Sequence, residues 1–565
     1  MKPLFKFNDL ESAIILLLLG NFLLGASYIA MLPIWEGFDE TSHFSYIQLV
    51  ADNRELPLDR KDPISSDVER YYDYAPIPHA LSSKLKSSDR LTYKSFFLKS
   101  DKFISKGHDF IHSTHNYPRK YLPGHGYSWE SQHPPLYYIL LSPVYLMTNS
   151  LSWSKQIFFL RITSYFFAWL GLVLGAFGCL GIAKNQTTIK KVQLWNWAAI
   201  GCGLWPVFFP GWFSDVARLG NDSVCVLLIA LTWVVCLRMI QRGVSIKYFL
   251  LLGLILGLGC LTKAFFVPVS MGVLAFWVFR QRKVGGRSGL KQVVGFSSSA
   301  LILIMILSGW WYWNNLVQYG VLLGSNEMIW LQLAGGLWKE LNEKFTFYQW
   351  VRGHSVILIT FAFIGSWSSL KPPWVFLLPI GMSVLGVTSF YLWTIRHYTK
   401  TSKEWFPVWL SIPLLVGLSY HVLIRIGLTG EGRGTGGYFL HILATPLASA
   451  LGISLYGIWN RRLFRAITQA YFGYIILFSI GITWLQSLFF SGLISASKEE
   501  RIYSFPEQLP PFWGLAEAYQ RLHVLVYPNV GLFLLVIGWG TILIGLVFTK
   551  RFARQSNSKQ KSITS

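Results

Sequence analysis

The chain has 565 residues, of which 52% are hydrophobic and only 14% are charged. Soluble globular proteins carry about 25% charged residues, so this composition excludes a soluble multi-domain protein and a disordered one. The 25 Trp, 27 Tyr and 41 Phe suit long membrane–water boundaries. The net charge of +23 fits basic cytoplasmic loops of a membrane protein better than nucleic-acid binding. We therefore expect an all-α polytopic membrane protein.

Long apolar runs divide the chain. A helix needs about 20 mostly apolar residues to cross the roughly 30 Å hydrocarbon core of a bilayer. By this measure the sequence predicts about 12 transmembrane helices, within a range of about 11–14. They are expected at Ile14–Pro33, Phe158–Ala183, Leu194–Trp212, Val224–Ile240, Tyr248–Leu261, Ala264–Phe279, Val293–Trp313, Trp374–Thr394, Trp405–Ile424, Tyr438–Trp459, Tyr471–Phe489 and Pro528–Phe548.

Two shorter apolar stretches, Pro134–Met147 and Val356–Trp367, are predicted to be interfacial or re-entrant segments that do not cross. With this assignment the four strongest basic clusters all fall on one side of the membrane, as cytoplasmic loops do. They are Lys184/Lys190/Lys191, Arg280/Arg282/Lys283/Arg287/Lys291, Arg461/Arg462/Arg465 and Lys550/Arg551/Arg554. Both termini are then cytoplasmic, a large external loop follows the first helix, and the protein resides in the plasma (inner) membrane.

The predicted organisation has six parts. They are a cytoplasmic N-terminus with the first helix (1–33), an external loop with interfacial helices (34–156), helices two to seven (157–313), an external loop with a re-entrant or interfacial segment (314–373), helices eight to twelve (374–549) and a basic cytoplasmic tail (550–565).

Three carboxylates and a histidine stand shortly after the first predicted helix: Glu36, Asp39, Glu40 and His43. A carboxylate at the membrane edge is partly desolvated, which is costly unless it is paired or functional. In a turn, one carboxylate can accept a proton while its neighbour binds a partner or a metal. The structural alternative is that Asp39 caps a helix that carries Glu40 and His43 on its first turn.

Two further polar pairs open apolar segments. Gln132 and His133 precede two prolines, which favour an extended entry to the segment that follows, and both side chains are expected at the mouth of the membrane. Asn221 and Asp222 open a predicted helix, where capping is the alternative role.

Two positively charged side chains in the predicted external regions, Lys263 and Arg433, could bind an anionic group. Lys263 interrupts a long apolar run, where it is either a point charge for a lipid-linked phosphate or a side chain that snorkels to water. Arg433 lies in a glycine-rich segment, whose backbone amides can approach an anion closely, and arginine binds phosphate bidentately.

Five segments occur in a recognisable order: Phe38–Phe44, Gln132–Tyr138, Gly220–Asp222, Leu261–Lys263 and Trp310–Gly320. In that order they resemble an Asp-Glu motif, a Gln-x-Pro-Pro-Leu-Tyr-Tyr entry, an Asn-Asp pair, a Leu-Thr-Lys motif and a Trp-Tyr-x-x-Asn…Tyr-Gly stretch. These motifs are typical of GT-C-type integral-membrane glycosyltransferases, in particular family 39 and the protein-mannosyltransferase-like proteins. Each motif is weak alone, whereas their joint order is specific.

This resemblance implies transfer of a sugar from a polyprenyl-phosphate donor to a glycan, lipid or protein acceptor at the outer face. Asp39 would be the catalytic base, with Glu40 as a second catalytic residue. Lys263 and Arg433 would bind the phosphate. Donor or acceptor would be positioned by His43, Gln132, His133, Asn221 and Asp222. One base with no nucleophile predicts inversion at the anomeric carbon.

The resemblance leaves some points open. Such families differ in their use of metal, so a divalent cation is compatible with it, and no other cofactor is expected. Many relatives carry Gly-Arg-Tyr at the start of a late helix, where this chain has Gly436, Gly437 and Tyr438. The nearest arginine is Arg433, which is a candidate to replace the missing one.

Two other classes of function compete with this interpretation. A multi-pass transporter or a flippase for lipid-linked sugars also suits about twelve helices with both termini inside, although the two similar halves typical of transporters are missing. A non-catalytic assembly protein is the third hypothesis, and it predicts that Asp39→Asn leaves the function unchanged.

Overall fold

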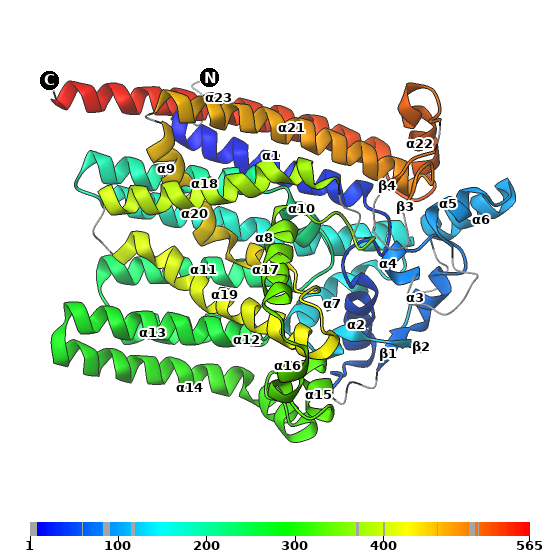
Figure 1. Cartoon of the computed structure of the whole chain (residues 1–565), viewed down its shortest axis with the longest axis horizontal. Helices are drawn as coiled ribbons and strands as arrows, with labels where there is room; N and C mark the ends of the chain where they lie inside the picture. The colour runs from blue at the N-terminus through cyan, green and yellow to red at the C-terminus, as the bar shows by residue number, and fades with distance from the viewer. Residues whose placement is uncertain are drawn as a thin grey trace.

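The computed structural model describes residues 8–58, 60, 62–82, 91–114, 119–368, 372–398, 402–459, 461–496, 503–506 and 508–564. In these ranges the protein is almost entirely helical, and its strands form two small two-stranded sheets. Most of the long helices run along one another as a bundle, and the short elements gather at one end of it (Figure 1). The predicted all-α class is confirmed.

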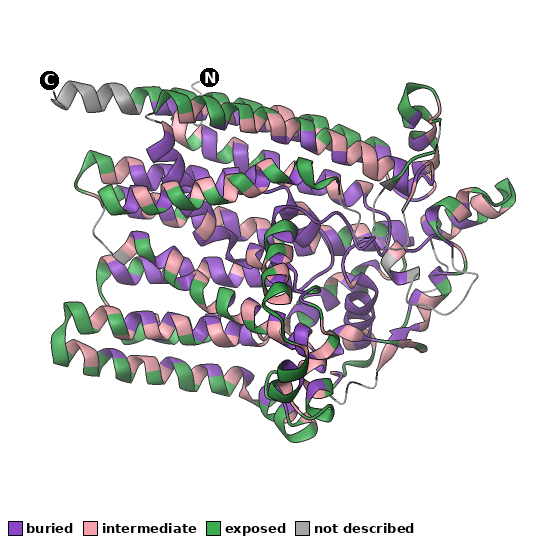
Figure 2. Ribbon diagram, viewed as in Figure 1, coloured by how far each residue is buried: buried purple, intermediate pink, exposed green. Residues whose placement is uncertain are grey.

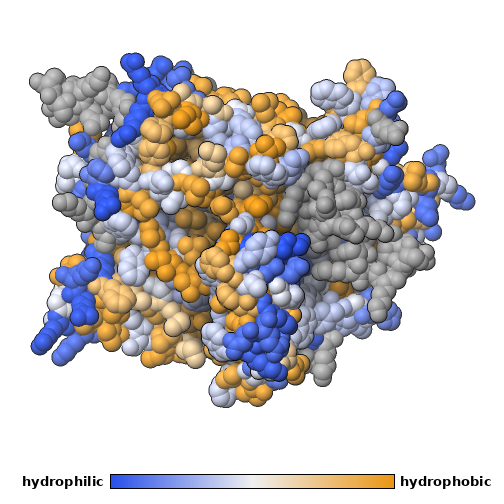
Figure 3. Space-filling model, in the orientation of Figure 1, coloured by the Kyte–Doolittle hydropathy of each residue, from blue (hydrophilic) through white to orange (hydrophobic). Residues whose placement is uncertain are grey.

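Nine helices of the described ranges are long and apolar enough to cross a membrane. They are α1 (Asp9–Met31), α8 (Trp153–Lys184), α11 (Asp222–Arg242), α14 (Gly286–Tyr319), α18 (Trp374–Tyr398), α19 (Ser402–Thr429), α20 (Ala444–Trp459) with the turn η2 before it (Gly437–Leu443), α21 (Arg462–Phe490) and α23 (Pro528–Thr564). The surface along the bundle is mainly apolar between more polar ends (Figure 3). The chain is therefore a multi-pass membrane protein.

Three more predicted spans coincide with bundle helices: α9 (Ile189–Phe208), α12 (Ile246–Cys260) and α13 (Phe266–Val284). With 15 residues, α12 is about 22 Å long, which is short of the roughly 30 Å of a bilayer core. Basic residues occupy one end of α9 and of α13. The count of twelve spans therefore stays a prediction.

The two ends of the bundle differ in charge. The α8–α9, α13–α14 and α20–α21 connections and both termini lie toward the left in Figure 1, and these segments carry the four basic clusters. The short polar elements lie at the other end, which we call the polar end. The charge pattern predicts that the basic end faces the cytoplasm.

The polar end is built from the segments that join bundle helices. Between α1 and α8 lie α2 (Glu40–Asn53), β1 (Pro63–Ser65), α3 (Ser66–Tyr71), α4 (His79–Ser82), α5 (Tyr93–Phe97), α6 (Asp101–His112), β2 (Pro123–Tyr127), η1 (Trp129–Gln132) and α7 (Leu136–Thr148). Elsewhere in the chain it includes α10 (Gly211–Val216), α15 (Asn326–Leu333), α16 (Leu337–Lys344), α17 (Phe347–Ala362), β3 (Ser495–Ala496), β4 (Tyr503–Ser504), η3 (Phe512–Gly514) and α22 (Leu515–Leu522).

The two apolar stretches that were predicted not to span form short helices at this end. They are α7, with 13 residues, and α17, with 16 residues. In Figure 1, α17 lies across the bundle instead of along it. Neither helix reaches the length of about 20 residues that a span requires.

A buried aromatic cluster attaches the first loop to the bundle. The Trp35 ring is fully buried, and its centroid lies 5.4–5.7 Å from those of Phe44, Tyr71 and Trp153 in edge-to-face arrangements. Such pairs contribute about 0.5–1.5 kcal/mol each beyond their buried area. Because these rings come from α2, α3 and α8, the start of α2 is fixed relative to the bundle. Buried ribbon continues through this junction in Figure 2, whereas α14, α21 and α23 expose their outer faces.

Candidate active site

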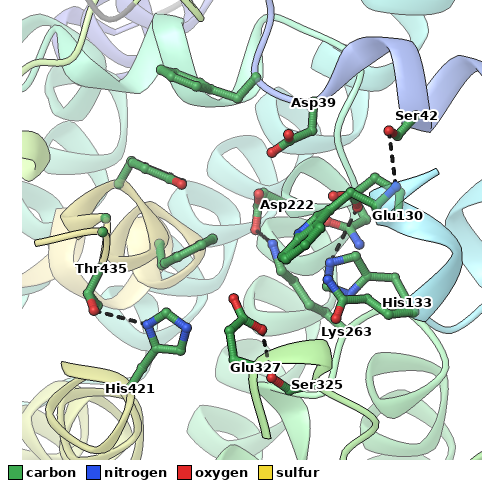
Figure 4. A pocket seen from close by; sticks show the side chains of 18 of the residues that line it. Asp39, Ser42, Glu130, His133, Asp222, Lys263, Ser325, Glu327, His421 and Thr435 are labelled. Atoms are coloured by element: carbon green, nitrogen blue, oxygen red, sulfur yellow. Dashed lines mark hydrogen bonds and ion pairs between the residues drawn. The ribbon is translucent and has the colours of Figure 1, made fainter. Parts of the chain in front are cut away.

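A cavity of about 1190 Å³ opens at the polar end of the bundle. Its wall comes from the turn before α2, from η1, from the α10–α11 and α12–α13 connections, from the start of α15, from α19 and from residues 431–439. Pockets that bind one small molecule have volumes of about 300–1,000 Å³. The cavity is therefore large enough for the reacting ends of two substrates. Figure 4 shows some of the side chains that line it.

Asp39 lines this cavity from a tight turn between α1 and α2 (Figure 4). The guanidinium of Arg161 on α8 holds the turn by donating to the carbonyl oxygens of Leu32 and Pro33, at 2.6 and 2.8 Å. Asp39 itself has a φ of +56°, a left-handed conformation that few residues other than Gly, Asn and Asp adopt. The capping alternative is not what the structure shows, because the Asp39 side chain makes no capping hydrogen bond to α2.

Glu40 follows Asp39 but is bound to the bundle. One oxygen, Oε2, lies 2.6 Å from Nη2 of Arg161, and the other, Oε1, accepts a hydrogen bond from Nε of Arg161 at 2.8 Å. Backbone N–H groups of Gly37 and Leu219 donate to the same carboxylate at 3.1 and 3.0 Å. Glu40 is fully buried and is not among the described residues that line the cavity. Glu40 is thus bound by Arg161 and by backbone N–H groups away from the cavity, and its catalytic role stays a prediction.

Gly37 shows how closely this turn is packed around the ion pair. A Cβ atom at Gly37 would lie 2.3 Å from Cδ of Glu40, so a side chain there would displace the carboxylate. The Glu40–Arg161 pair and the glycine together fix the direction in which Asp39 leaves the turn.

A buried ion network forms the deep wall of the cavity. Nζ of Lys263 lies 2.6 Å from Oδ1 of Asp222, and Nη2 of Arg218 lies 3.3 Å from Oδ2 of Asp222. The same guanidinium is 3.3 Å from Oδ1 of Asp215, and these side chains are at most 7% exposed. Buried charges persist only when they are paired and hydrogen-bonded. Two cations and two carboxylates therefore compensate one another beside the cavity.

This network also touches the turn that carries Asp39. Nη1 of Arg218 donates to the carbonyl oxygen of Phe38 at 2.9 Å, one residue before Asp39. Arg218 was not selected as a candidate site residue from the sequence. Its link to Phe38, 180 positions away, depends on the tertiary fold.

Asn221 and Lys263 do not make the contacts of the structural alternatives considered for them. Asn221 is the N-cap residue of α11, yet its side chain makes no capping hydrogen bond. Its Nδ2 donates instead to the carbonyl oxygen of Thr262 at 3.5 Å, which links α11 to the residue before Lys263. Lys263 does not snorkel to water, because it is 6% exposed and paired with Asp222.

A second polar cluster surrounds Glu130, which the sequence analysis did not select. Oε2 of Glu130 lies 3.5 Å from Nε2 of His43 and 3.3 Å from Nε2 of His133, and it accepts a hydrogen bond from the Tyr138 hydroxyl at 3.4 Å. The two predicted positioning histidines thus meet at one carboxylate. Glu130, His43 and His133 all line the cavity.

Burial controls the protonation of this cluster. Burial, and then the charge of Asp39, raise the pKa of Glu130 to about 8. Burial, and then the charge of Arg218, lower the pKa of His43 well below its usual range, and burial followed by the charge of Lys263 lowers the pKa of His133 to about 3. At neutral pH the Glu130 carboxyl therefore holds a proton and both imidazoles are uncharged.

Glu130→Gln is expected to flatten the dependence of stability on pH. Between its usual pKa of 4.5 and about 8, Glu130 stays protonated in the folded protein and loses its proton on unfolding. Its contribution to stability is thus complete below 4.5 and is lost as the pH rises toward 8. Thermal unfolding in detergent is measured at four pH values between about 4.5 and 8. As the pH rises, the Tm of the wild type should fall relative to the Tm of Glu130→Gln. Parallel Tm profiles would contradict the assigned pKa.

The remaining two predicted residues, Gln132 and Arg433, make their contacts with residues outside the ion network. Oε1 of Gln132 accepts a hydrogen bond from the backbone N–H of Asn326 at 3.0 Å, so Gln132 holds the start of α15. Arg433 lines the exposed rim of the cavity, where its Nε lies 3.3 Å from Oε2 of Glu431. Its side chain is 56% exposed, in contrast to the buried Lys263.

Gly437 stands where the family motif has arginine, and the packing around Gly437 explains why this position is glycine. A Cβ atom at Gly437 would lie 1.7 Å from the carbonyl oxygen of Ile357 on α17. The Gly437 N–H donates to Oγ1 of Thr360 on the same helix at 2.7 Å. Contact between α17 and η2 therefore excludes any side chain at this position.

Gly437→Arg is accordingly expected to destabilise the protein by at least about 1–3 kcal/mol, the usual cost of overpacking, and not to restore a family function. The Tm in detergent and the monodisperse fraction after purification measure the effect. Gly473→Ala on α21 is the matched control, because nothing lies within 4 Å of a Cβ there. A Gly437→Arg variant as stable as this control would contradict the described packing.

Metal binding was left open by the sequence. Among the residues that the structure describes, no three His, Cys, Asp or Glu side chains form a group that could hold a metal ion. The cations that face the cavity are instead lysine and arginine side chains.

The central part of the chain matches a known family. Residues 187–313 match the family model described as dolichyl-phosphate-mannose-protein mannosyltransferase. The predicted resemblance is confirmed. Over these residues the chain is similar to a glycosyltransferase family, as the motifs implied. The matched segment contains Asp222 and Lys263 but not Asp39, and no curated protein sequence matches the chain.

Solved structures give a weaker likeness. ArnT from Cupriavidus metallidurans bound to undecaprenyl phosphate is 12% identical, with a TM-score of 0.37 over 73% of this chain and 68% of that one. AglB, an oligosaccharyltransferase from Archaeoglobus fulgidus in complex with an inhibitory peptide and a dolichol-phosphate, is 14% identical. Its TM-score is 0.34 over 90% of this chain and 60% of that one. Overlaps this low carry no information on the site.

Proposed function

We propose that the protein transfers a sugar from a polyprenyl-phosphate-linked donor to a glycan, lipid or protein acceptor at the outer face of the plasma (inner) membrane. The observation that carries this proposal is that Asp39 and the Asp222–Lys263–Arg218 network line one cavity at the polar end of a membrane bundle. The matched family, whose description names a dolichyl-phosphate sugar, supports the donor class.

In the proposed reaction the acceptor hydroxyl attacks the anomeric carbon directly. Asp39 takes the hydroxyl proton as the new carbon–oxygen bond forms. The bond between the anomeric carbon and the phosphate oxygen breaks, and its electron pair leaves with the polyprenyl phosphate. Lys263 and Arg218 stabilise that anion in a buried site, where fixed cations act most strongly. Direct displacement inverts the anomeric configuration.

The other cavity residues support this reaction in the proposal. Asp222 holds Lys263 and Arg218 in place, and Asn221 ties α11 to the α12–α13 connection. Neutral His43 and His133 offer ring nitrogens to substrate hydroxyl groups beside protonated Glu130. Arg433 attracts an anionic substrate at the rim without binding it in the deep site.

A transfer assay tests the function. The purified protein in liposomes receives a panel of radiolabelled polyprenyl-phosphate sugars, with crude membranes as acceptor. Movement of label into a product of inverted configuration supports the proposal, and a retained configuration would refute direct displacement. If label instead crosses the bilayer on the unchanged lipid, the protein is a flippase.

A further inference from the structure

Glu327 is a cavity carboxylate outside the catalytic groups assigned above. It lies on the first turn of α15, and its carboxylate projects into the cavity below Lys263 and across from His421 (Figure 4). The Ser325 hydroxyl donates to its Oε2 at 2.8 Å. Within the described ranges this is its one hydrogen bond, and no Lys, Arg or His nitrogen of these ranges lies within 4 Å. Unlike Glu40 and Asp222, Glu327 thus forms no ion pair with a residue of the described ranges.

The neighbouring residue, Asn326, makes three hydrogen bonds that fix the start of α15 and thereby the position of Glu327. Its backbone N–H donates to Gln132, its Nδ2 donates to the Tyr127 hydroxyl at 3.0 Å, and its Oδ1 accepts from Arg60 at 3.2 Å. Arg60 also donates to Oδ1 of Asn315 on α14 at 2.8 Å. Tyr127, Gln132 and Arg60 therefore hold the start of α15, whereas Trp330, Gln332 and Leu333 in its second half are exposed.

This anchoring serves a cavity-facing side chain. Asn326 is 5% exposed, whereas the next residue presents its carboxylate to the cavity. A rigid support around one side chain is typical of groups that must meet a substrate in a fixed geometry. Gln132, a predicted positioning residue, accordingly acts through α15.

The opposite wall offers polar groups of the same kind. Nδ1 of His421 on α19 lies 2.9 Å from Oγ1 of Thr435, and both residues line the cavity near Glu327 (Figure 4). The Glu327 carboxylate, the His421 imidazole and the Thr435 hydroxyl thus face one space. Together they can bind the hydroxyl groups of a ligand, because hydroxyl groups both donate and accept hydrogen bonds. A phosphate does not fit beside Glu327, because two anions repel each other.

We propose that Glu327 binds the hydroxyl groups of a sugar in the cavity, either the sugar carried by the donor or a carbohydrate acceptor. This inference rests on the proposed function. Glu327 is a specificity-determining residue here, whose carboxylate accepts hydrogen bonds from the sugar while Lys263 and Arg218 hold the phosphate. Hydrogen bonds to a charged acceptor are strong enough to change affinity about tenfold each.

Equilibrium binding and acceptor kinetics on the purified full chain test the proposal. Bare polyprenyl phosphate and a panel of polyprenyl-phosphate hexoses are the binding probes, and the KM for acceptor is measured at saturating donor. Glu327→Gln should weaken binding of the preferred hexosyl lipid about tenfold and leave the bare lipid unchanged, which identifies the donor sugar. A rise in acceptor KM with unchanged lipid binding identifies the acceptor.

Two further variants separate substrate contact from structural damage. Glu343→Gln on α16 removes the same charge at an exposed site outside the described cavity wall, and it should change neither measurement. Gln132→Ala should reproduce the Glu327→Gln effect and add little to it in the double variant, because both act through the same contact.

The outcomes distinguish this inference from the proposed function. If the wild type transfers no sugar, the proposed function fails, and the binding arm still tests Glu327. Equal weakening of bare and hexosyl lipid by Glu327→Gln would overturn the inference, since it would indicate a general loss of structure. Unchanged binding would also overturn it, unless the acceptor KM rises.

Discussion

Asp39→Asn is expected to slow sugar transfer by about 100- to 10,000-fold, the usual range for losing a positioned base. Asparagine has nearly the same shape as aspartate and also tolerates the left-handed conformation at this position, so the turn should survive. It cannot accept the proton of the acceptor hydroxyl. Initial rates of transfer from the preferred lipid donor, measured beside the Tm in detergent, give the result.

Asp109→Asn is a matched control for this variant. Asp109 lies on α6 with 68% of its side chain exposed, so the same chemical change there should leave the rate unchanged. Binding of bare polyprenyl phosphate should be retained in Asp39→Asn, because Lys263 and Arg218, the cations proposed to bind the phosphate, are unchanged. A folded Asp39→Asn variant with more than a tenth of the wild-type rate would show that Asp39 is not the base.

The long helices were predictable because each of them contains a long run of consecutive apolar residues, which can be recognised in the sequence. Each of the twelve predicted spans falls on a bundle helix, and α7 and α17 are short, as their apolar lengths indicate. The arrangement of the polar end was not predictable in this way. Many of its helices and strands are short. Contacts such as that of Trp35 with Trp153 join positions that are over one hundred residues apart in the sequence.

The site shows the same division between local and distant information. The resemblance selected Asp39, Asp222 and Lys263 together, and they line one cavity. Glu130 was not selected, because its importance comes from His43, which approaches it from α2. Glu327 carries no local signal at all, since its support by Gln132 and Arg60 arises only in the folded chain.

Adjacent Asp39 and Glu40 illustrate the limit most clearly. Their sequence context is shared, and both were predicted to be catalytic. The left-handed turn at Asp39 and the guanidinium of Arg161, 121 positions away, send the two carboxylates to different surroundings. No pattern within the Asp-Glu motif contains that information.

Loss of either partner of the Glu40–Arg161 pair is therefore expected to cost about 3–5 kcal/mol of stability, because the remaining charge is left buried without compensation. Arg161→Met should be the more damaging change, since Arg161 also binds the carbonyl oxygens of Leu32 and Pro33. The Tm in detergent and the yield of monodisperse protein measure both variants. Glu517→Gln, which breaks the partly exposed pair with Arg521 on α22, is the control and should cost at most about 1 kcal/mol.

The double variant Glu40→Gln with Arg161→Met separates the ion pair from the other contacts of Arg161. Once both charges are gone, neither is left unpaired, so the double variant should be more stable than the sum of the single losses predicts. The carbonyl contacts are not restored, and recovery should be partial. A Glu40→Gln variant that keeps the wild-type Tm but loses transfer would reverse the assignment. It would show that the carboxylate bound to Arg161 acts in the reaction, and that the cavity must open toward α8 during turnover.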